Sequence, residues 1–292
     1  MNVLVLGDRG LVGRELRRAL TRANVATRGL DLEDGGDVRD PGRLRLAAEG
    51  QRPSKGTGFD WVVNLAAMTA VDECESRPDE AAAVNAAGAR NAARLAAGLG
   101  ARFLQVSTDY VFDGWKKTPW RESDPPRPIS VYGRTKWEGE EACREVLQSE
   151  RLLVVRGQSL YGEGAKSFPD AIVRKAGEGK PIPVVTDQTV SPTWARDFAE
   201  GLASLLRADA SGLFLLSASG HCTWFEFAKE VLREWGADPS LVVPTTARAL
   251  ARPAKRPAWS VFDLAKFEAA VPGTIRDWQT QLRDYRESKR AA

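Results

Sequence analysis

The feature that most constrains the fold is an apolar strand that leads directly into a glycine-rich turn. The run Asn2–Leu6 predicts a strand buried on both faces, and Gly7, Gly10 and Gly13 follow it at intervals of three residues. Apolar residues then recur at helical spacing over 11–20, so a helix begins in the same turn. Glycine at these positions permits a tight turn, the close approach of a pyrophosphate and close packing of helix on strand.

The alternation of short apolar runs and helical patterns continues through the first 160 residues. Further strands are predicted at Val25–Leu30, Trp61–Leu65, Arg102–Val106 and Leu152–Val155, and helices at Asp79–Leu99 and Ser130–Leu147. Strands that are apolar on both faces and separated by helices indicate a parallel sheet that is covered on each side. The sequence therefore predicts the α/β class, with a doubly wound parallel sheet of the Rossmann type.

Beyond about residue 160 the alternation loosens, and proline-bearing segments separate the predicted helices. We expect a first domain over residues 1–160, with returning segments near 190–210, and a smaller domain mainly over 161–292. The helices predicted in this second part are Trp194–Leu206, Trp224–Trp235 and Thr274–Arg290.

The composition excludes several classes of function. His221 is the only histidine among 292 residues, so a two-histidine metal site is excluded and acid–base chemistry must mostly use another side chain. We interpret His221 itself as a structural residue of a turn. The net charge is only +3 and is spread along the chain. Nothing therefore points to a nucleic acid or to an anionic membrane surface as a partner.

The cysteines and the apolar runs indicate the compartment. Cys74, Cys143 and Cys222 are far apart and form no C-x-x-C pair, which argues against a disulfide framework or a zinc site and favours buried thiols. No stretch reaches the length of a membrane span, and the N-terminal apolar run is shorter than that of a signal peptide. We expect a cytoplasmic protein.

The glycine-rich turn predicts a nicotinamide dinucleotide as cofactor. Asp31 ends the second predicted strand 18 residues after Gly13, near the spacing of the acid that binds the adenosine ribose. A carboxylate there accepts a hydrogen bond from the 2′-hydroxyl of NADH and repels the 2′-phosphate of NADPH. Arg9 and Arg28 are close enough in sequence to favour the phosphate instead. The sequence leaves NADPH or NADH open.

Tyr132 and Lys136 lie four residues apart in a predicted helix and so share one face. Thr108 closes a buried strand about 24 residues earlier, at the edge where α/β sheets bind ligands. An ordinary tyrosine has a pKa near 10, which a lysine ammonium and a positively charged nicotinamide would lower. Tyrosine can then replace histidine as the general acid.

A second pair, Tyr285 and Lys289, has the same spacing near the C-terminus. It belongs to a charged terminal helix, and no cofactor motif is nearby. We interpret this second pair as surface decoration.

Together these residues resemble the extended short-chain dehydrogenase/reductase superfamily, and longer strings narrow the resemblance to the dTDP-4-dehydrorhamnose reductase family. The strings are Val63–Asp72, Ser107–Gly114, Val131–Lys136, Asp187-Gln188 with Ser191–Thr193, and Pro253–Pro257. They stand in the order of that family, and the match runs from residue 1 to about 285.

The resemblance implies an NAD(P)-binding Rossmann domain, a sugar-nucleotide-binding domain and a cleft between them. It also implies reduction of the C4 ketone of a dTDP-4-keto-6-deoxyhexose, such as dTDP-4-dehydrorhamnose. The nicotinamide would supply hydride and Tyr132 the proton. Thr108 would hydrogen-bond the ketone oxygen, and Lys136 would hold the nicotinamide ribose.

The motifs and the resemblance together assign the expected site residues. Asp37-Val38 is either a second contact, with the acid meeting the adenine amino group, or an ordinary turn. The expected cofactor-binding residues are Gly7, Gly10, Leu11, Val12, Gly13, Asp31, Asp37, Val38, Ala66, Ala67, Thr69, Tyr132 and Lys136. The expected substrate-binding residues are Thr108, Asp109, Tyr110, Ser159, Ser167, Phe168 and Arg256. Some relatives bind Mg²⁺ at a dimer interface, but no ligand cluster here predicts a metal, and a homodimer stays open.

Two departures from the family pattern fall in the expected substrate pocket. Ser159 stands where the family usually has tryptophan, and Ser167 stands where it has asparagine. Trp194 either compensates for the missing tryptophan or packs in the core. The sequence therefore predicts the reaction type and leaves the sugar open.

Two other functions compete with the reductase. A nucleotide-sugar dehydratase or epimerase is disfavoured because the resembling 4,6-dehydratases have a second acid where this chain has Tyr110. A non-catalytic NADP-binding regulatory subunit, like the β subunit of methionine adenosyltransferase, is disfavoured because Thr108, Tyr132 and Lys136 are all present.

Overall fold

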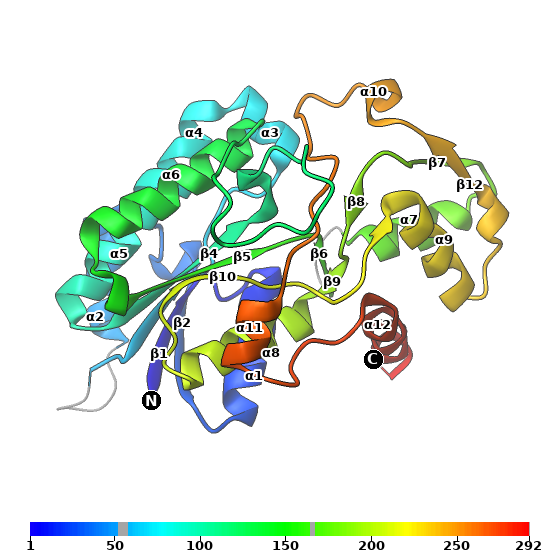
Figure 1. Ribbon diagram of the computed structural model, residues 1–292. Helices are drawn as coiled ribbons and strands as arrows, with labels where there is room; N and C mark the ends of the chain where they lie inside the picture. Colours follow the sequence, from blue (N-terminus) through cyan, green and yellow to red (C-terminus); the bar gives the residue numbers. More distant parts are fainter. Residues whose placement is uncertain (52–57, 164–166, 292) are drawn as a thin grey trace.

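A six-stranded parallel sheet forms the centre of the molecule (Figure 1). The computed structural model describes residues 1–51, 58–163 and 167–291. Its strands lie in the order β2-β1-β3-β4-β5-β10. Their bounds are β1 Asn2–Leu6, β2 Ala26–Leu30, β3 Trp61–Asn64, β4 Arg102–Thr108, β5 Leu152–Gly157 and β10 Gly212–Leu215. The predicted doubly wound α/β fold is confirmed, and its strand order reverses between β1 and β3.

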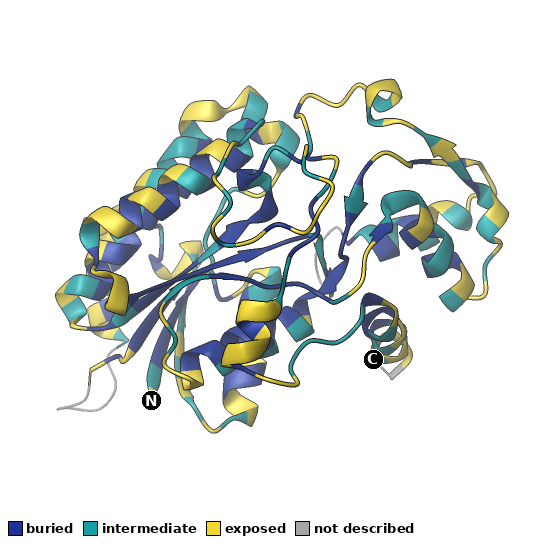
Figure 2. Ribbon diagram, viewed as in Figure 1, coloured by how far each residue is buried: buried dark blue, intermediate teal, exposed yellow. Residues whose placement is uncertain are grey.

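Helices cover both faces of this sheet, as Figure 1 shows. One face carries α1 (Leu11–Arg22), α8 (Ala195–Arg207) and α11 (Ala265–Ala270); the other carries α2 (Pro41–Gly50), α5 (Gly88–Leu99) and α6 (Val131–Val146). Each helix buries an apolar stripe against the strands and exposes its polar side (Figure 2). The sheet is thus buried on both faces, as its continuous apolar runs predict.

The helix predicted at Asp79–Leu99 is interrupted by a π-helical turn. It consists of α4 (Pro78–Ala82), η2 (Ala83–Ala87) and α5, and α3 (Val71–Ser76) precedes it. Asn85 in the π turn is buried, and its amide bonds to both backbone groups of Met68 and to the Thr135 hydroxyl. Gly139 of α6 crosses this turn so closely that a Cβ would lie 2.2 Å from the Asn85 carbonyl oxygen. This contact fixes α6 against the π-helical turn.

The C-terminal part has a separate apolar core between α7 (Phe168–Ala176), α9 (Trp224–Glu234) and α12 (Trp278–Ala291). Tyr285 of α12 is fully buried in this core, so its interpretation as surface decoration is wrong. The strands of this part are β6 Leu160–Tyr161, β7 Ile182–Val185, β8 Thr189–Val190, β9 Thr193–Trp194, β11 Cys222–Thr223 and β12 Val242–Thr245. The short helices of the chain are η1 Leu32–Asp34, η3 Asp109–Val111, η4 Ser149–Arg151, η5 Pro239–Leu241 and α10 Ala247–Leu250.

The division into domains at residue 160 stays a prediction. Within the segment expected to return near 190–210, α8 packs against α1 on the main sheet. Two later elements also join the sheet side, since β10 pairs with β5 and Phe267 of α11 lies in the same apolar cluster.

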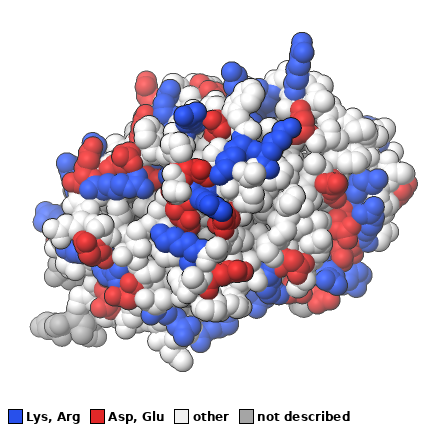
Figure 3. Space-filling model, viewed as in Figure 1, with Lys and Arg blue, Asp and Glu red and all other residues white. Residues whose placement is uncertain are grey.

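Surface and composition features complete the description. Basic and acidic side chains are interspersed over the face shown in Figure 3. The three cysteines are free and buried, as expected. Within the described ranges, no helix is long and apolar enough to cross a membrane. The same residues contain no cluster of three or more His, Cys, Asp or Glu side chains able to hold a metal ion.

Candidate active site

The glycine-rich turn is as tight as its spacing predicts. Gly7 has a φ of +75°, and a Cβ there would lie 2.9 Å from the backbone nitrogen of Ala66. A Cβ on Gly13 would lie 2.3 Å from the carbonyl oxygen of Gly7. Side chains at either position would therefore collide with backbone. The turn brings the start of α1 next to the end of β3, where the strand order reverses.

A cavity of about 310 Å³ lies at this turn, and we call it the dinucleotide cavity. Its lining residues are Gly7, Gly10, Asp31, Leu32, Gly36, Asp37, Val38, Arg39, Leu65, Ala66, Ala67, Glu80 and Val84. Bare glycine backbone, an α1 N-terminus without a side-chain cap and a carboxylate at the end of β2 suit a dinucleotide. The residues present therefore fit the implied cofactor.

Seven of the expected cofactor residues line this cavity: Gly7, Gly10, Asp31, Asp37, Val38, Ala66 and Ala67. The others lie outside its lining. Leu11 and Val12 belong to the first turn of α1, Thr69 is exposed, and Tyr132 and Lys136 lie on α6. The motif spacing missed Leu32, Gly36, Arg39, Leu65 and Glu80. The Gly35-Gly36 pair, which begins four residues after Asp31, was the available signal, because a Cβ on Gly36 would lie 2.8 Å from the Asp31 carbonyl oxygen.

Asp31 and Asp37 differ in their partners. Asp31 Oδ2 accepts from the backbone N–H of Arg9 at 3.1 Å, and Oδ1 accepts from that of Leu32 at 2.8 Å. These two bonds hold its carboxylate at the cavity wall. Asp37 accepts from the guanidinium of Arg39 at 2.8 and 2.9 Å, and these bonds lower the pKa of Asp37.

The structure brings Thr108, Tyr132 and Tyr110 together where β4 ends. Ser130 begins α6 by accepting from the backbone N–H of Gly133 at 3.1 Å. A Cβ on Gly133 would lie 2.1 Å from the Tyr110 carbonyl oxygen, so the first turn of α6 packs directly on the segment that follows β4. The rings of Tyr110 and Tyr132 meet edge to face with centroids 5.3 Å apart. Tyr132 is half-buried.

Burial shifts the pKa values of both Tyr132 and Lys136. Burial raises the pKa of Tyr132, and a hydrogen bond with Thr108 lowers it by less. Lys136 Nζ donates to the carbonyl oxygen of Val106 at 2.7 Å, and burial lowers the pKa of Lys136 to about 8. In the chain by itself, burial outweighs the hydrogen bond that lowers the pKa of Tyr132, and the lowering expected from Lys136 together with a positively charged nicotinamide stays a prediction. The phenol stays protonated near neutral pH, as a proton donor must.

Asp109 lies behind Thr108 and is only 3% exposed. Its Oδ1 accepts from the Thr108 hydroxyl at 3.0 Å, and its Oδ2 accepts from the Ser260 hydroxyl at 2.5 Å. Burial raises the pKa of Asp109 to about 6, although both hydroxyls lower it. Both oxygens of this expected substrate-binding residue are thus used within the protein.

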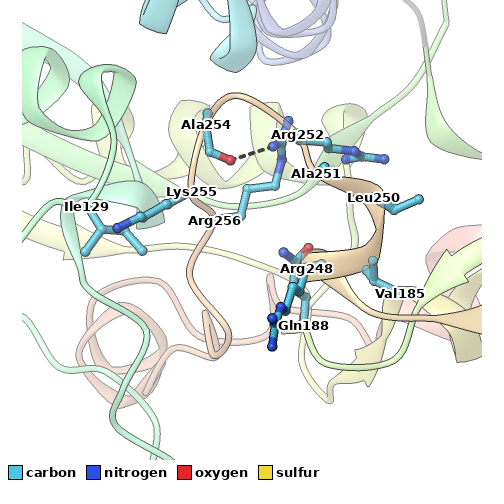
Figure 4. Close-up of a pocket in the computed structure, with 11 residues that line it drawn as sticks. Ile129, Val185, Gln188, Arg248, Leu250, Ala251, Arg252, Ala254, Lys255 and Arg256 are labelled. Atoms are coloured by element: carbon cyan, nitrogen blue, oxygen red, sulfur yellow. Dashed lines mark hydrogen bonds between the residues drawn. The ribbon is translucent and has the colours of Figure 1, made fainter.

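The second cavity, of about 340 Å³, lies beside the connection that follows β12, and we call it the basic cavity. Its lining residues are Ile129, Val185, Gln188, Ala247, Arg248, Leu250, Ala251, Arg252, Ala254, Lys255 and Arg256 (Figure 4). Figure 4 shows Arg248, Arg252 and Lys255 on this connection, and Ile129 on the loop before α6.

Arg256, expected to bind substrate, is held by other groups of the chain. Its guanidinium bonds both carboxylate oxygens of Asp72 on α3, at 2.8 and 3.1 Å, and donates to the Ala254 carbonyl at 3.0 Å (Figure 4). Arg248, Arg252 and Lys255 are exposed and make no ion pair within the ranges that the structure describes. Sequence reasoning missed these three. The signal was present, because residues 248–256 contain four basic side chains.

Ser159 and Ser167, which depart from the family pattern, line neither cavity. Ser159 has a left-handed backbone, with φ +49°, and its carbonyl accepts from the Thr193 N–H. Ser167 is buried before α7, and Phe168 packs on Trp224 and Phe227 with ring centroids 4.6 and 5.5 Å apart. The core alternative for Trp194 is confirmed by its 4% exposure.

Comparisons with known proteins give one consistent result. The family described as the RmlD substrate binding domain matches residues 1–290. A dTDP-4-dehydrorhamnose reductase from Streptomyces griseus is 41% identical, over 96% of this chain and 91% of that protein. A dTDP-4-keto-6-deoxy-D-glucose reductase from Streptomyces niveus is 35% identical, over 96% and 94%. A solved dTDP-4-dehydrorhamnose reductase from Bacillus anthracis, in complex with NADP, is 28% identical with a TM-score of 0.91, over 98% and 99%.

Proposed function

This chain belongs to the dTDP-4-dehydrorhamnose reductase family, and from that premise we propose that it reduces the C4 ketone of a dTDP-4-keto-6-deoxyhexose with NADPH or NADH. The observation that carries the proposal is the meeting of Thr108, Tyr132 and Lys136 at the sheet edge that also holds the dinucleotide cavity. The substrate we propose first is dTDP-4-dehydrorhamnose.

In this proposal Tyr132 is the general acid. A bound nicotinamide dinucleotide would supply the hydride that forms the new C–H bond at C4. The carbonyl π electrons move to oxygen, and the Tyr132 hydroxyl gives that oxygen its proton, so the ketone becomes an alcohol. The phenolate left behind then takes a proton from solvent. A positioned acid of this kind contributes about 10²- to 10⁴-fold to the rate.

The environment of Tyr132 supports this direction of proton transfer. Burial holds its pKa above the usual value, so the proton is present at neutral pH before the reaction begins. A bound nicotinamide would add positive charge beside the phenol as it gave up its hydride, and such a charge would favour the phenolate. Lys136, which is protonated below pH 8, adds a second positive charge on the same face of α6.

The basic cavity is the proposed site of the substrate diphosphate. Arg248, Arg252 and Lys255 place three cations around one cavity, and guanidinium groups pair with phosphate oxygens by two parallel hydrogen bonds. Arg256, fixed to Asp72, holds the connection in place. Contacts of Ser159, Ser167 and Phe168 with the sugar remain predictions, and with them the identity of the sugar.

The cytoplasm is the compartment we propose, since the three buried free thiols are typical of reducing compartments. The homodimer also remains a prediction, which sedimentation of the purified chain would check.

An assay of NADH and NADPH oxidation with dTDP-4-dehydrorhamnose tests the proposed function. The wild-type chain is expected to oxidise the cofactor and to form dTDP-rhamnose, and Tyr132→Phe is expected to lose this activity while it still binds dinucleotide. No turnover by the wild type, or equal turnover by the variant, would contradict the proposal. Sugar conversion without net cofactor oxidation would indicate an epimerase or dehydratase, and dinucleotide binding without any conversion would indicate a regulatory subunit.

A further inference from the structure

A charged corner lies at the end of β2, where Asp31 lines the dinucleotide cavity and Arg9, Glu33 and Asp34 lie next to Asp31 outside the lining of the cavity. Asp31 lies at the cavity wall, and Arg9 bonds it through its backbone N–H. The Arg9 side chain turns to the next acids along the chain. Its guanidinium donates to both oxygens of Asp34 at 2.8 Å and forms an ion pair with Glu33. A single cation is thus shared by two carboxylates, beside a third.

We propose that this chain selects NADH over NADPH because Glu33 and Asp34 occupy Arg9, the cation that would otherwise receive a 2′-phosphate. The inference rests on the proposed function, since it concerns the dinucleotide of that same reaction. It resolves a choice that the sequence leaves open between the Asp31 carboxylate and the arginines.

The charges of the corner favour the ribose hydroxyl. Asp31, Glu33 and Asp34 carry three negative charges and Arg9 carries one positive charge. The Asp31 carboxylate can accept a hydrogen bond from a 2′-hydroxyl, as it does from two backbone N–H groups. A 2′-phosphate would bring about two further negative charges into the same corner.

The other nearby arginines do not offset this repulsion. Arg39 lines the cavity, but its guanidinium is held by Asp37, and Glu80 lies 3.9 Å from it. Arg28 is exposed on β2, donates to the carbonyl of Thr27 and does not line the cavity. The binding of a 2′-phosphate would therefore require Arg9 to leave Glu33 and Asp34.

Dissociation constants measured without sugar test this inference directly. NADH and NADPH are titrated into the purified chain, with the nucleotide fluorescence as the signal and calorimetry as a check. We expect the wild type to bind NADH at least about tenfold more tightly, the discrimination that one charge-assisted hydrogen bond supplies. The double variant Glu33→Gln/Asp34→Asn should release Arg9 and lower this ratio at least about fivefold. Adding Arg9→Ala to it should reverse that gain in NADPH binding.

A charge-matched control separates the corner from the overall charge of the molecule. Glu49→Gln/Glu141→Gln removes two carboxylates from exposed positions on α2 and α6 and should leave the ratio unchanged. Wild-type binding of NADPH as tight as that of NADH would overturn the inference, and so would equal ratios in the double variant and the control. The proposed function fails separately, if the chain binds a dinucleotide and reduces no keto sugar with either one.

Discussion

Two tyrosine–lysine pairs with identical spacing lie in opposite environments in this molecule. Tyr132 and Lys136 lie on α6 where β4 ends, and Tyr132 meets the Thr108 hydroxyl. Tyr285 and Lys289 lie on α12, where the Tyr285 hydroxyl donates to the carboxylate of Asp170 at 2.9 and 3.0 Å. Lys289 Nζ is 3.2 Å from the same carboxylate. The spacing places both side chains on one helix face in each case, and the partner opposite that face decides what the pair can do.

The hydrogen-bond partners distinguish the two tyrosine hydroxyls. Tyr285 is fully buried, and its single hydroxyl proton already has a carboxylate acceptor. Tyr132 is half-buried at the sheet edge that binds ligands, beside a threonine whose own proton goes to Asp109. The Tyr132 hydroxyl therefore has a neutral hydroxyl as its partner rather than a carboxylate, and we propose that its proton passes to a substrate oxygen.

The largest expected effect separates the two tyrosines by activity. Tyr132→Phe should lower kcat by about 10²- to 10⁴-fold, because the general acid is lost, and Tyr285→Phe should leave kcat within about twofold. Steady-state kinetics with saturating cofactor measure both, and circular dichroism confirms that both variants fold. Comparable losses of kcat in the two folded variants would show that Tyr132 and Tyr285 do not differ in their importance for the reaction.

The next expected effect is on stability, where Tyr285 should matter more than Tyr132. Tyr285→Phe should lower the free energy of unfolding by about 1–3 kcal/mol, since a hydrogen bond to a charged acceptor is lost. Tyr132→Phe should change it by less than about 1 kcal/mol, because it removes a hydroxyl that meets only a neutral partner. Urea unfolding followed by tryptophan fluorescence measures both. Equal stability losses would show that burial of the hydroxyl does not distinguish the pairs.

The sequence predicted the main sheet well and the surroundings of Tyr285 poorly. Residues 1–160 follow simple rules: apolar runs form parallel strands, and the ligand site lies at their carboxyl ends. The Tyr285 environment depends on Asp170, which is 115 residues away on α7. No local pattern encodes such a contact. The same holds for Arg256, whose partner Asp72 is 184 residues distant.

Lys136 should give the reductase a pH dependence that Lys289 does not share. Burial lowers the pKa of Lys136 to about 8, so its ammonium is present below pH 8 and is lost as the pH rises through this value. We expect kcat/KM for the cofactor to fall about tenfold per pH unit above 8. Lys136→Arg keeps the charge and should move the fall to higher pH. If kcat/KM of Lys136→Arg fell at the same pH as that of the wild type, the fall would have to come from the titration of another group.

The smallest effect is expected at Lys289. Its amine is exposed, and exposed ion pairs contribute about 0–1 kcal/mol. Lys289→Ala should therefore leave kcat unchanged and lower the free energy of unfolding by less than about 1 kcal/mol. The same urea titration checks this. A loss as large as that of Tyr285→Phe would show that the lysine is part of the buried contact.

Transfer of deuterium from the cofactor to the sugar tests directly whether this chain reduces the C4 ketone. The wild-type chain is incubated with dTDP-4-dehydrorhamnose and a reduced cofactor that carries deuterium at the transferable position of the nicotinamide, and the product is examined by NMR and mass spectrometry. We expect one deuterium at C4 of the product for each cofactor molecule oxidised, and a rate of deuterium transfer that is about 10²- to 10⁴-fold lower in Tyr132→Phe. A product without deuterium at C4, or a Tyr132→Phe variant as fast as the wild type, would contradict this expectation.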